Sequence, residues 1–307
     1  MSEQTASGQG QSPLYVRPPM PEFGRLEYKY LVPKELLPDL RRAIAPYVRL
    51  DGFCASRPDR QYTIRSIYYD TRRFACYDEK FDGFRLKKKL RIRGYNQPGP
   101  ESVVFLEIKR KEEDFISKSR APVPWSRVGE VFAGYGPAAA LPFEPGSAAA
   151  EAAGRFLYNY YRRRMLPTAL IAYEREAFFG RFNPLLRFTL DRNVRSRLYP
   201  QLSSLYSDRD ARFVMPNHFV FEVKFYLHLP QWVRHVVQQF DLQRLAVSKY
   251  ALGIEAHRVE KKELRNIGHT VEFPERPEPL ERRRVEKWVD GVLEGAGTAT
   301  ASHDKER

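Results

Sequence analysis

Residues 83–95, GFRLKKKLRIRGY, carry a cation at every second position. This alternation has the two-residue period of a β-strand, so the cations share one face while Leu86, Leu90 and Ile92 share the other. Like charges this close repel one another unless an anion lies among them. The pattern therefore indicates a strand whose charged face meets something negative. The cations are Arg85, Lys87, Lys89, Arg91 and Arg93.

The same alternation recurs in other segments that are rich in β-forming residues. Charged and apolar residues alternate in FGRLEYKYLV (23–32), in SVVFLEIKRK (102–111) and in PLLRFTLDRNV (184–194). Each of these strands would have one charged face and one apolar face.

The elements that must position these faces follow from the same periodicity. We predict antiparallel strands joined mostly by short loops, an irregular segment at 112–150, and a few helices. This is an antiparallel α+β architecture that could close into a barrel. The predicted strands are 23–32, 61–71, 83–95, 102–111, 168–180, 184–194 and 213–227, and the predicted helical regions are 32–48, 151–165 and 230–246.

Composition limits the class of protein and its partners. The chain has 307 residues, 42% hydrophobic and 29% charged, which is typical of a soluble globular protein. Lys and Arg total 52 against 38 acidic residues, a net charge of +14 that favours a polyanionic partner. Cys54 and Cys76 lack metal-ligand spacing, which indicates free thiols in a reducing compartment.

The chain divides into three parts by composition. Residues 1–20 are polar and predict a disordered leader, residues 21–258 predict one domain, and residues 259–307 form a charged tail with one predicted helix around 280–293. Neither a signal peptide nor a membrane-spanning segment is evident in the sequence. We therefore expect a cytoplasmic protein, or one attached peripherally to a membrane.

Two arrangements of the strands fit the alternation. In the first, an ordinary half-exposed sheet, the apolar face packs on a core and the charged face meets water. In the second, helices cover the apolar outside of a barrel of about eight strands, and the charges line its interior. Isolated buried charges cost several kcal/mol each, so the second arrangement requires a bound anion, with a metal or with glutamates among the cations.

A series of motifs, in this order along residues 22–255, resembles a known family. RLEYKYLV, IRSIYYDT, YDEKFDG, KLRIRGY, FLEIKRK, SKSR, YEREAF, RFTLD, FEVKF and SKYALG are similar to the motifs of the vacuolar transporter chaperone (VTC) polyphosphate polymerase domain, a triphosphate tunnel metalloenzyme. The resemblance implies an antiparallel eight-stranded β-barrel with helices packed outside. It also implies binding of a triphosphate or polyphosphate chain with Mn²⁺ or Mg²⁺.

The resemblance also implies roles for individual residues. Arg91, Arg93, Glu222 and Lys249 would carry catalysis, with Glu222 as the metal ligand. Other cations and hydroxyls would bind phosphate along the tunnel. These are Lys29, Arg65, Lys80, Lys89, Lys109, Lys118, Arg120, Tyr173, Arg175, Arg187 and Ser248.

The function that the resemblance implies is transfer of the ATP γ-phosphoryl group to a growing polyphosphate chain. Two alternatives stay open: a triphosphatase or polyphosphate hydrolase of the same fold, and a non-catalytic protein that binds polyphosphate or RNA. The sequence has no G-x-x-x-x-G-K-[ST] loop and no aromatic RNA-binding motif, so we expect neither a P-loop nor specific nucleic-acid binding. Export of the product through a membrane would need a separate membrane partner.

Overall fold

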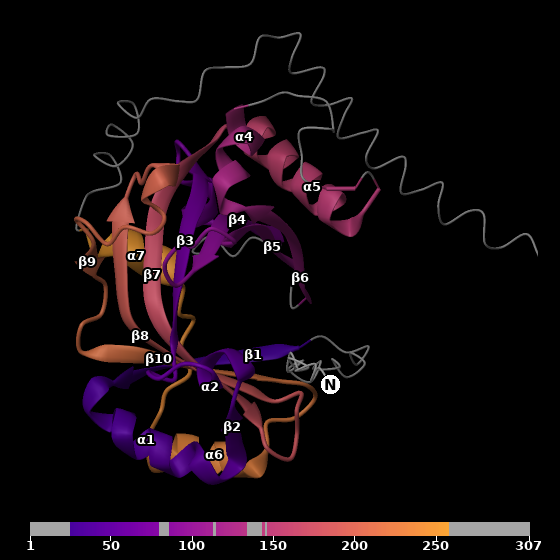
Figure 1. Cartoon of the computed structure of the whole chain (residues 1–307). Helices are drawn as coiled ribbons and strands as arrows, with labels where there is room; N and C mark the ends of the chain where they lie inside the picture. The colour runs from indigo at the N-terminus through magenta and orange to yellow at the C-terminus, as the bar shows by residue number, and fades with distance from the viewer. Residues whose placement is uncertain (1–24, 80–85, 113–114, 134–142, 145, 258–307) are drawn as a thin grey trace, which may run out of the picture.

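The structure is a computed structural model that describes residues 25–79, 86–112, 115–133, 143–144 and 146–257 (Figure 1). The predicted leader at 1–20, the tail at 259–307 and Lys80 lie outside these residues. None of the helices in the described ranges has the length and apolar character needed to cross a membrane.

One antiparallel sheet organises the described chain. Its strands follow the order β1-β10-β8-β7-β3-β4-β5-β6, with β2 paired to β7 and β9 paired to β8. Long strands rich in Val, Ile, Tyr and Phe favour this pleated arrangement. The bounds are β1 Leu26–Pro33, β2 Val48–Leu50, β3 Tyr62–Thr71, β4 Leu86–Tyr95, β5 Val103–Glu112, β6 Phe115–Pro124, β7 Met165–Gly180, β8 Arg187–Leu198, β9 Arg212–Phe213 and β10 His218–Phe225.

The two ends of this sheet come together through side chains. No backbone pairing joins β1 to β6 within the described residues. A bridge between Tyr30 and Arg244 covers part of the free edge of β1, and Lys109 Nζ on β5 lies 4.0 Å from Glu27 Oε2 on β1. The predicted α+β class and antiparallel barrel arrangement are confirmed, with one side of the barrel left open in its hydrogen bonding.

Strand β6 corrects the prediction of an irregular segment at 112–150. Residues 115–124 pair with β5 over their whole length, although they include Pro122 and Pro124. Proline is tolerated in an edge strand because one side of that strand has no ladder to donate to. The prolines therefore concealed an edge strand.

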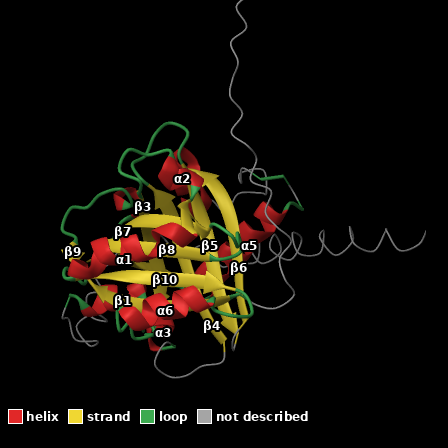
Figure 2. Cartoon of the chain, turned by 90° about the horizontal axis from the view of Figure 1, so that it is seen from below, coloured by secondary structure: helices red, strands yellow, loops and turns green. Residues whose placement is uncertain are grey.

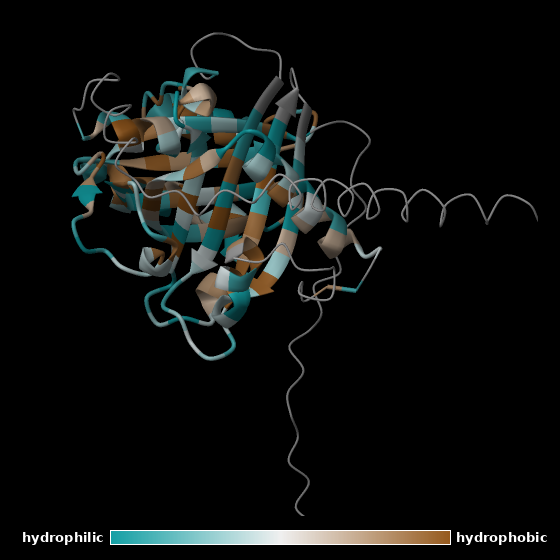
Figure 3. Cartoon of the chain, turned by 90° about the horizontal axis from the view of Figure 1, so that it is seen from above, coloured by the Kyte–Doolittle hydropathy of each residue, from teal (hydrophilic) through white to brown (hydrophobic). Residues whose placement is uncertain are grey.

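Helices α1 (Leu37–Ile44) and α6 (Gln231–Gln239) cover one part of the sheet's outer face. Figure 2 shows both lying across β1, β10 and β8. Leu40 and Val233 are fully buried against Phe221, in a core formed by the apolar positions of these strands. Apolar strand residues thus point outward under the helices, as the alternating bands of hydropathy in Figure 3 illustrate.

Helix α5 (Ala148–Arg162) covers β4, β5 and β6 in the same manner (Figure 1). Its Phe156 packs in a core with Leu90, Ile92 and Leu106, the apolar positions that alternate with the cations. The Ser147 hydroxyl accepts a hydrogen bond from the backbone N–H of Ala150 and caps the helix. The shorter helices are α2 Gly52–Ala55, α3 Ala75–Asp78 and α4 Val128–Ala133.

Helix α7 (Lys249–Glu255) packs on β7 and β8 from the opposite side of the sheet. Tyr250 stacks on Tyr68 of β3 with ring centroids 5.1 Å apart. The predicted helix at 230–246 was too long: α6 ends at Gln239, and Lys249 instead begins a separate helix.

Candidate phosphate-binding site

The sheet face opposite α1, α5 and α6, here called the inner face, carries the charged positions of the strands. Strand register places Lys29 beside Glu222, Lys224 beside Arg187, and Arg91 beside Glu107. Cations outnumber carboxylates on this face. The cations are Lys29, Lys89, Arg91, Arg93, Lys109, Lys118, Arg120, Arg175, Arg187, Lys224 and Lys249, and the carboxylates are Glu27, Glu107, Asp191 and Glu222.

Glu107 is the centre of one group of charges. Its side chain is 1% exposed, and Arg91 Nε donates to its Oε2 at 2.8 Å. Lys118 Nζ and Arg120 Nε from β6 lie 2.7 and 3.2 Å from Oε1, and Arg93 Nε is 3.9 Å from Oε2. Burial alone would raise the pKa of Glu107, but the surrounding cations outweigh it and hold the pKa well below its usual range.

Asp191 is the centre of a second group. Arg175 donates to both of its oxygens, at 2.6 and 2.8 Å, and Lys249 Nζ lies 2.6 Å from Oδ2. The Lys249 ammonium also lies 4.9 Å from the centre of the Tyr173 ring. Asp191 is fully buried, and Arg175 and Lys249 lower its pKa despite that burial. The predicted residues Tyr173, Arg175 and Lys249 are thus together.

A third group contains two carboxylates and two lysines. Lys29 Nζ lies 2.7 Å from Glu27 Oε1, and the Lys224 ammonium is ion-paired with Glu222 and lies 3.8 Å from Glu27 Oε2. Burial would lower the pKa of Lys29, but the attraction of Glu222 and Glu27 outweighs it and raises that pKa. Glu27 and Glu222 therefore share one side of the inner face.

The donor atoms around Glu222 suit a hard divalent cation. Thr189, its register partner, has a buried hydroxyl that lacks a hydrogen-bond partner among the described residues. The described ranges contain no group of three or more His, Cys, Asp or Glu side chains able to hold a metal alone. Mg²⁺ typically uses one or two carboxylates together with substrate phosphates, so Glu222, Glu27 and Thr189 fit such an ion.

Ser248 and Lys89 meet at the N-terminus of α7. Lys89 Nζ lies 3.1 Å from Ser248 Oγ, which also accepts a hydrogen bond from the backbone N–H of Ala251. The structure therefore brings these two predicted residues onto the inner face as well.

Of the predicted phosphate-binding residues that the structure describes, Arg65 lies away from the inner face and Arg187 lies at its margin. Arg65 is buried on the other face of β3, where it makes a two-bond pair with Asp208 at 2.6 and 2.9 Å. Residues 64, 66 and 68 of β3 face inward, whereas the odd-numbered Arg65 faces outward, so the structure does not bring it together with the other predicted residues. Arg187 is on the inner face but near its margin, 3.5 Å from Asp51 Oδ2.

Sequence reasoning missed several inner-face residues. Tyr68 and Ser66 contact Arg91 and Arg93, with O···N distances of 2.8 and 3.2 Å, but uncharged residues in strand 61–71 gave no signal. The missed charged residues, Lys224 and Asp191, lie on the same strand faces as residues predicted to belong to the site, so the alternation along the strands could have identified them.

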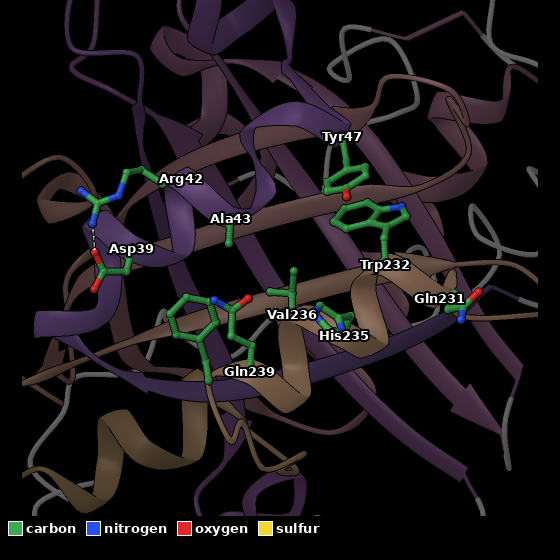
Figure 4. Close-up of a pocket in the computed structure, with 10 residues that line it drawn as sticks. Asp39, Arg42, Ala43, Tyr47, Gln231, Trp232, His235, Val236 and Gln239 are labelled. Carbon is green, nitrogen blue, oxygen red and sulfur yellow. Dashed lines mark hydrogen bonds and ion pairs between the residues drawn. The ribbon is translucent and has the colours of Figure 1, made fainter.

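A separate hollow lies on the outside between α1 and α6 (Figure 4). There the Tyr47 and Trp232 rings stack with centroids 4.3 Å apart, and Arg42 pairs with Asp39. One cation neutralised by its own carboxylate does not attract a polyanion, so this hollow is distinct from the inner face.

Comparison with known proteins identifies a family whose model matches most of the chain. The family model described as "VTC domain" matches residues 24–258. Among solved structures, the chain is similar to a putative adenylyl cyclase from Hippeastrum described as having a dominant triphosphatase activity. The identity is 13%, the TM-score is 0.40, and the match covers 75% of this chain and 94% of that one. No curated protein matches the chain.

Proposed function

Because the chain belongs to the VTC domain family, we propose that it is a metal-dependent polyphosphate polymerase that acts on its inner face. The family membership supports chemistry on phosphate chains. The proposal goes further in naming ATP as the phosphate donor and lengthening of the chain as the reaction. The observation that carries it is the excess of converging cations over carboxylates on that face. A phosphate chain would supply the missing negative charge.

In the proposed reaction, a terminal oxygen of the chain attacks the γ-phosphorus of ATP. The bond between that phosphorus and the β–γ bridging oxygen breaks, ADP leaves, and the chain is one phosphate longer. Such a transfer needs little covalent help from the protein, which acts by in-line positioning and by neutralising charge on the phosphate oxygens.

The arginines are suited to positioning. Arg91 and Arg93 are held by Glu107, Tyr68 and Ser66, and Arg175 is held by Asp191. A guanidinium has five N–H donors in a rigid plane, so each can keep these bonds and still donate to phosphate. In this proposal the three arginines bind the phosphate chain and hold it in position.

Lysines and carboxylates complete the site in this proposal. Lys249 and Lys29 act as point charges beside the transferred group, while Lys89, Lys109 and Lys118 attract the rest of the chain. Glu222, with Glu27 and Thr189 beside it, would hold Mn²⁺ or Mg²⁺. When bound, the ion supplies neutralisation of charge on adjacent phosphates.

Incubation of the purified protein with ATP and Mn²⁺ tests the proposal. We expect polyphosphate of increasing length on a gel, and loss of product in Arg93→Ala and Glu222→Gln. Arg49→Ala, an exposed arginine on β2, is the matched control that should keep activity. Release of orthophosphate from tripolyphosphate without chain growth would instead identify a triphosphatase, and salt-sensitive binding without turnover would identify a binding protein.

A further inference from the structure

Tyr68 occupies an unusual position among the cations of the inner face. Its hydroxyl oxygen accepts a hydrogen bond from Arg91 Nη1 at 2.8 Å. The Arg91 guanidinium carbon also lies 5.6 Å from the centre of the Tyr68 ring. A guanidinium offers only donors, so Arg91 stabilises negative charge on this oxygen and cannot accept its proton.

The surroundings of Tyr68 favour the charged form further. Within the described chain, the bond from Arg91 is the one hydrogen bond of this hydroxyl, so its proton has no protein acceptor. Most charged groups that face Tyr68 are positive. Tyr250 of α7 stacks on Tyr68, but its hydroxyl donates a hydrogen bond to Asp70 at 2.6 Å and not to Tyr68. The facing groups are Lys89, Arg91 and Arg93 on β4, Lys29 on β1 and Tyr250 on α7, while Glu107 and Tyr173 interact with Arg91.

We propose that Tyr68 is a positioning residue whose phenol oxygen is negatively charged in the free protein above neutral pH and takes up a proton when a phosphate chain enters. This inference rests on the proposed function and concerns the same site. In the free protein the phenolate partly neutralises Arg91 and Arg93. On binding, phosphate oxygens replace that charge, and the protonated hydroxyl becomes a donor to phosphate.

The titration of the group agrees with this geometry. Burial by itself would raise the pKa of Tyr68, but Arg91 and Arg93 outweigh it and lower the pKa to about 7. An incoming polyanion would raise the pKa again, because it disfavours a second negative charge nearby. Proton uptake by Tyr68 should therefore be greatest above neutral pH and should vanish in acid, where the phenol is already protonated.

Ultraviolet absorbance of tyrosinate tests the proposal directly. Free wild-type protein should show one tyrosine that ionises near neutral pH, and tripolyphosphate added at about pH 8 should remove its signal. Tyr68→Phe should lack both changes. The matched control is Tyr69→Phe, the next residue, whose ring packs under α5 and whose pKa is raised well above its ordinary value by burial.

Calorimetry in buffers of different ionisation enthalpy measures the proton count independently. Tyr68→Phe should bind tripolyphosphate with roughly half to one proton less uptake than wild type at about pH 8. Lys118, whose pKa is also lowered, would still contribute in both proteins. The wild-type absorbance signal keeps the test valid even if a variant fails to fold.

The outcomes separate this inference from the function it rests on. A wild-type protein that binds tripolyphosphate without losing tyrosinate absorbance would overturn the proton exchange alone. A wild-type protein that does not bind tripolyphosphate would overturn the proposed function, and the exchange with it.

Discussion

Arg91 on β4 and Glu107 on β5 are direct register partners, and the Arg91 Nε donates to Glu107 Oε2 at 2.8 Å. This pair explains how a strand with a cation at every second position is tolerated. Glu107 also contacts Arg93, Lys118 and Arg120, so a single buried carboxylate offsets repulsion among cations of two strands. The repulsion is reduced but not cancelled, which leaves this part of the inner face positive.

Replacing Glu107 with glutamine should destabilise the free protein. The variant keeps the shape of the side chain but leaves the surrounding cations without their buried partner, which typically costs about 3–5 kcal/mol. Urea unfolding would measure this loss. Tripolyphosphate should restore more stability to Glu107→Gln than to wild type, because the anion replaces the missing charge.

Glu130→Gln is the matched control for that variant. Glu130 is exposed and pairs with Arg127 three residues earlier on the surface, so its loss should change stability by about 0.5 kcal/mol or less. Equal effects in the two variants would contradict the central role of Glu107.

The sharing of one face by the charges could be predicted from the sequence, because side chains alternate along a strand. Their inward direction did not follow from this alternation, which fits a half-exposed sheet equally well, and was implied only by the family resemblance. Leu90 and Ile92 are fully buried under α5, while Arg91 and Arg93 face the other way. Parity also shows where a residue chosen from a motif lies away from the inner face. Arg65 lies within a matching motif but at the wrong parity, and it points to Asp208 instead.

Other features depend on contacts between distant segments and gave no local signal. The prolines in strand β6 masked its strand pattern. Helix α7 begins at Lys249 because the Ser248 side chain caps it, and a helix this short shows too little periodicity to be recognised in the sequence. Tyr68 becomes notable only once Arg91 is placed against it by strand pairing.

The affinity for a phosphate chain should fall as pH rises through about 8. Burial, despite the attraction of Glu107, lowers the pKa of Lys118 to about 8. Above that pH Lys118 loses the charge that attracts the anion. Lys118→Arg stays charged, so between about pH 7 and about pH 9 its affinity should fall several-fold less than that of wild type.

Calorimetric titration with tripolyphosphate across this pH range is the measurement. Lys34→Arg, an exposed lysine outside the site, serves as the control and should follow the wild-type curve. Identical pH profiles for Lys118→Arg and wild type would exclude Lys118 from the binding of the chain.

Glu222→Gln should weaken the effect of metal on binding. We expect Mn²⁺ to increase the affinity of the wild type for tripolyphosphate, and the variant to lose about tenfold or more of that increase. Comparison of calorimetric titrations with and without Mn²⁺ gives the ratio for each protein. Glu35→Gln, an exposed carboxylate near α1, should keep the wild-type ratio; a Glu222→Gln protein that also keeps it would remove Glu222 as a ligand.

Helix α7 should be sensitive to the size of residue 253. A Cβ at Gly253 would lie 2.3 Å from Ile171 Cδ1, the end of a side chain, and 3.2 Å from Ser196 Cβ. Gly253→Ala should therefore make the Ile171 side chain move aside and push α7 and Ser196 slightly apart. Overpacking costs about 1–3 kcal/mol, partly offset by the gain of about 1 kcal/mol in helix propensity.

That shift should also move Lys249 relative to Asp191. Gly253→Ala should therefore bind tripolyphosphate more weakly as well as unfold at lower urea concentration. Gly52→Ala is the control, because a Cβ there meets nothing within 4 Å. If Gly253→Ala is destabilised but binds tripolyphosphate with unchanged affinity, the position of α7 does not affect binding.

A crystal structure of the protein with tripolyphosphate and Mn²⁺ tests the central claim most directly. The account predicts phosphate oxygens within hydrogen-bond distance of Arg91, Arg93 and Lys249, on the sheet face opposite α1, α5 and α6. Phosphate bound instead on the outer, helix-covered side, with the inner-face ion pairs unchanged, would contradict it.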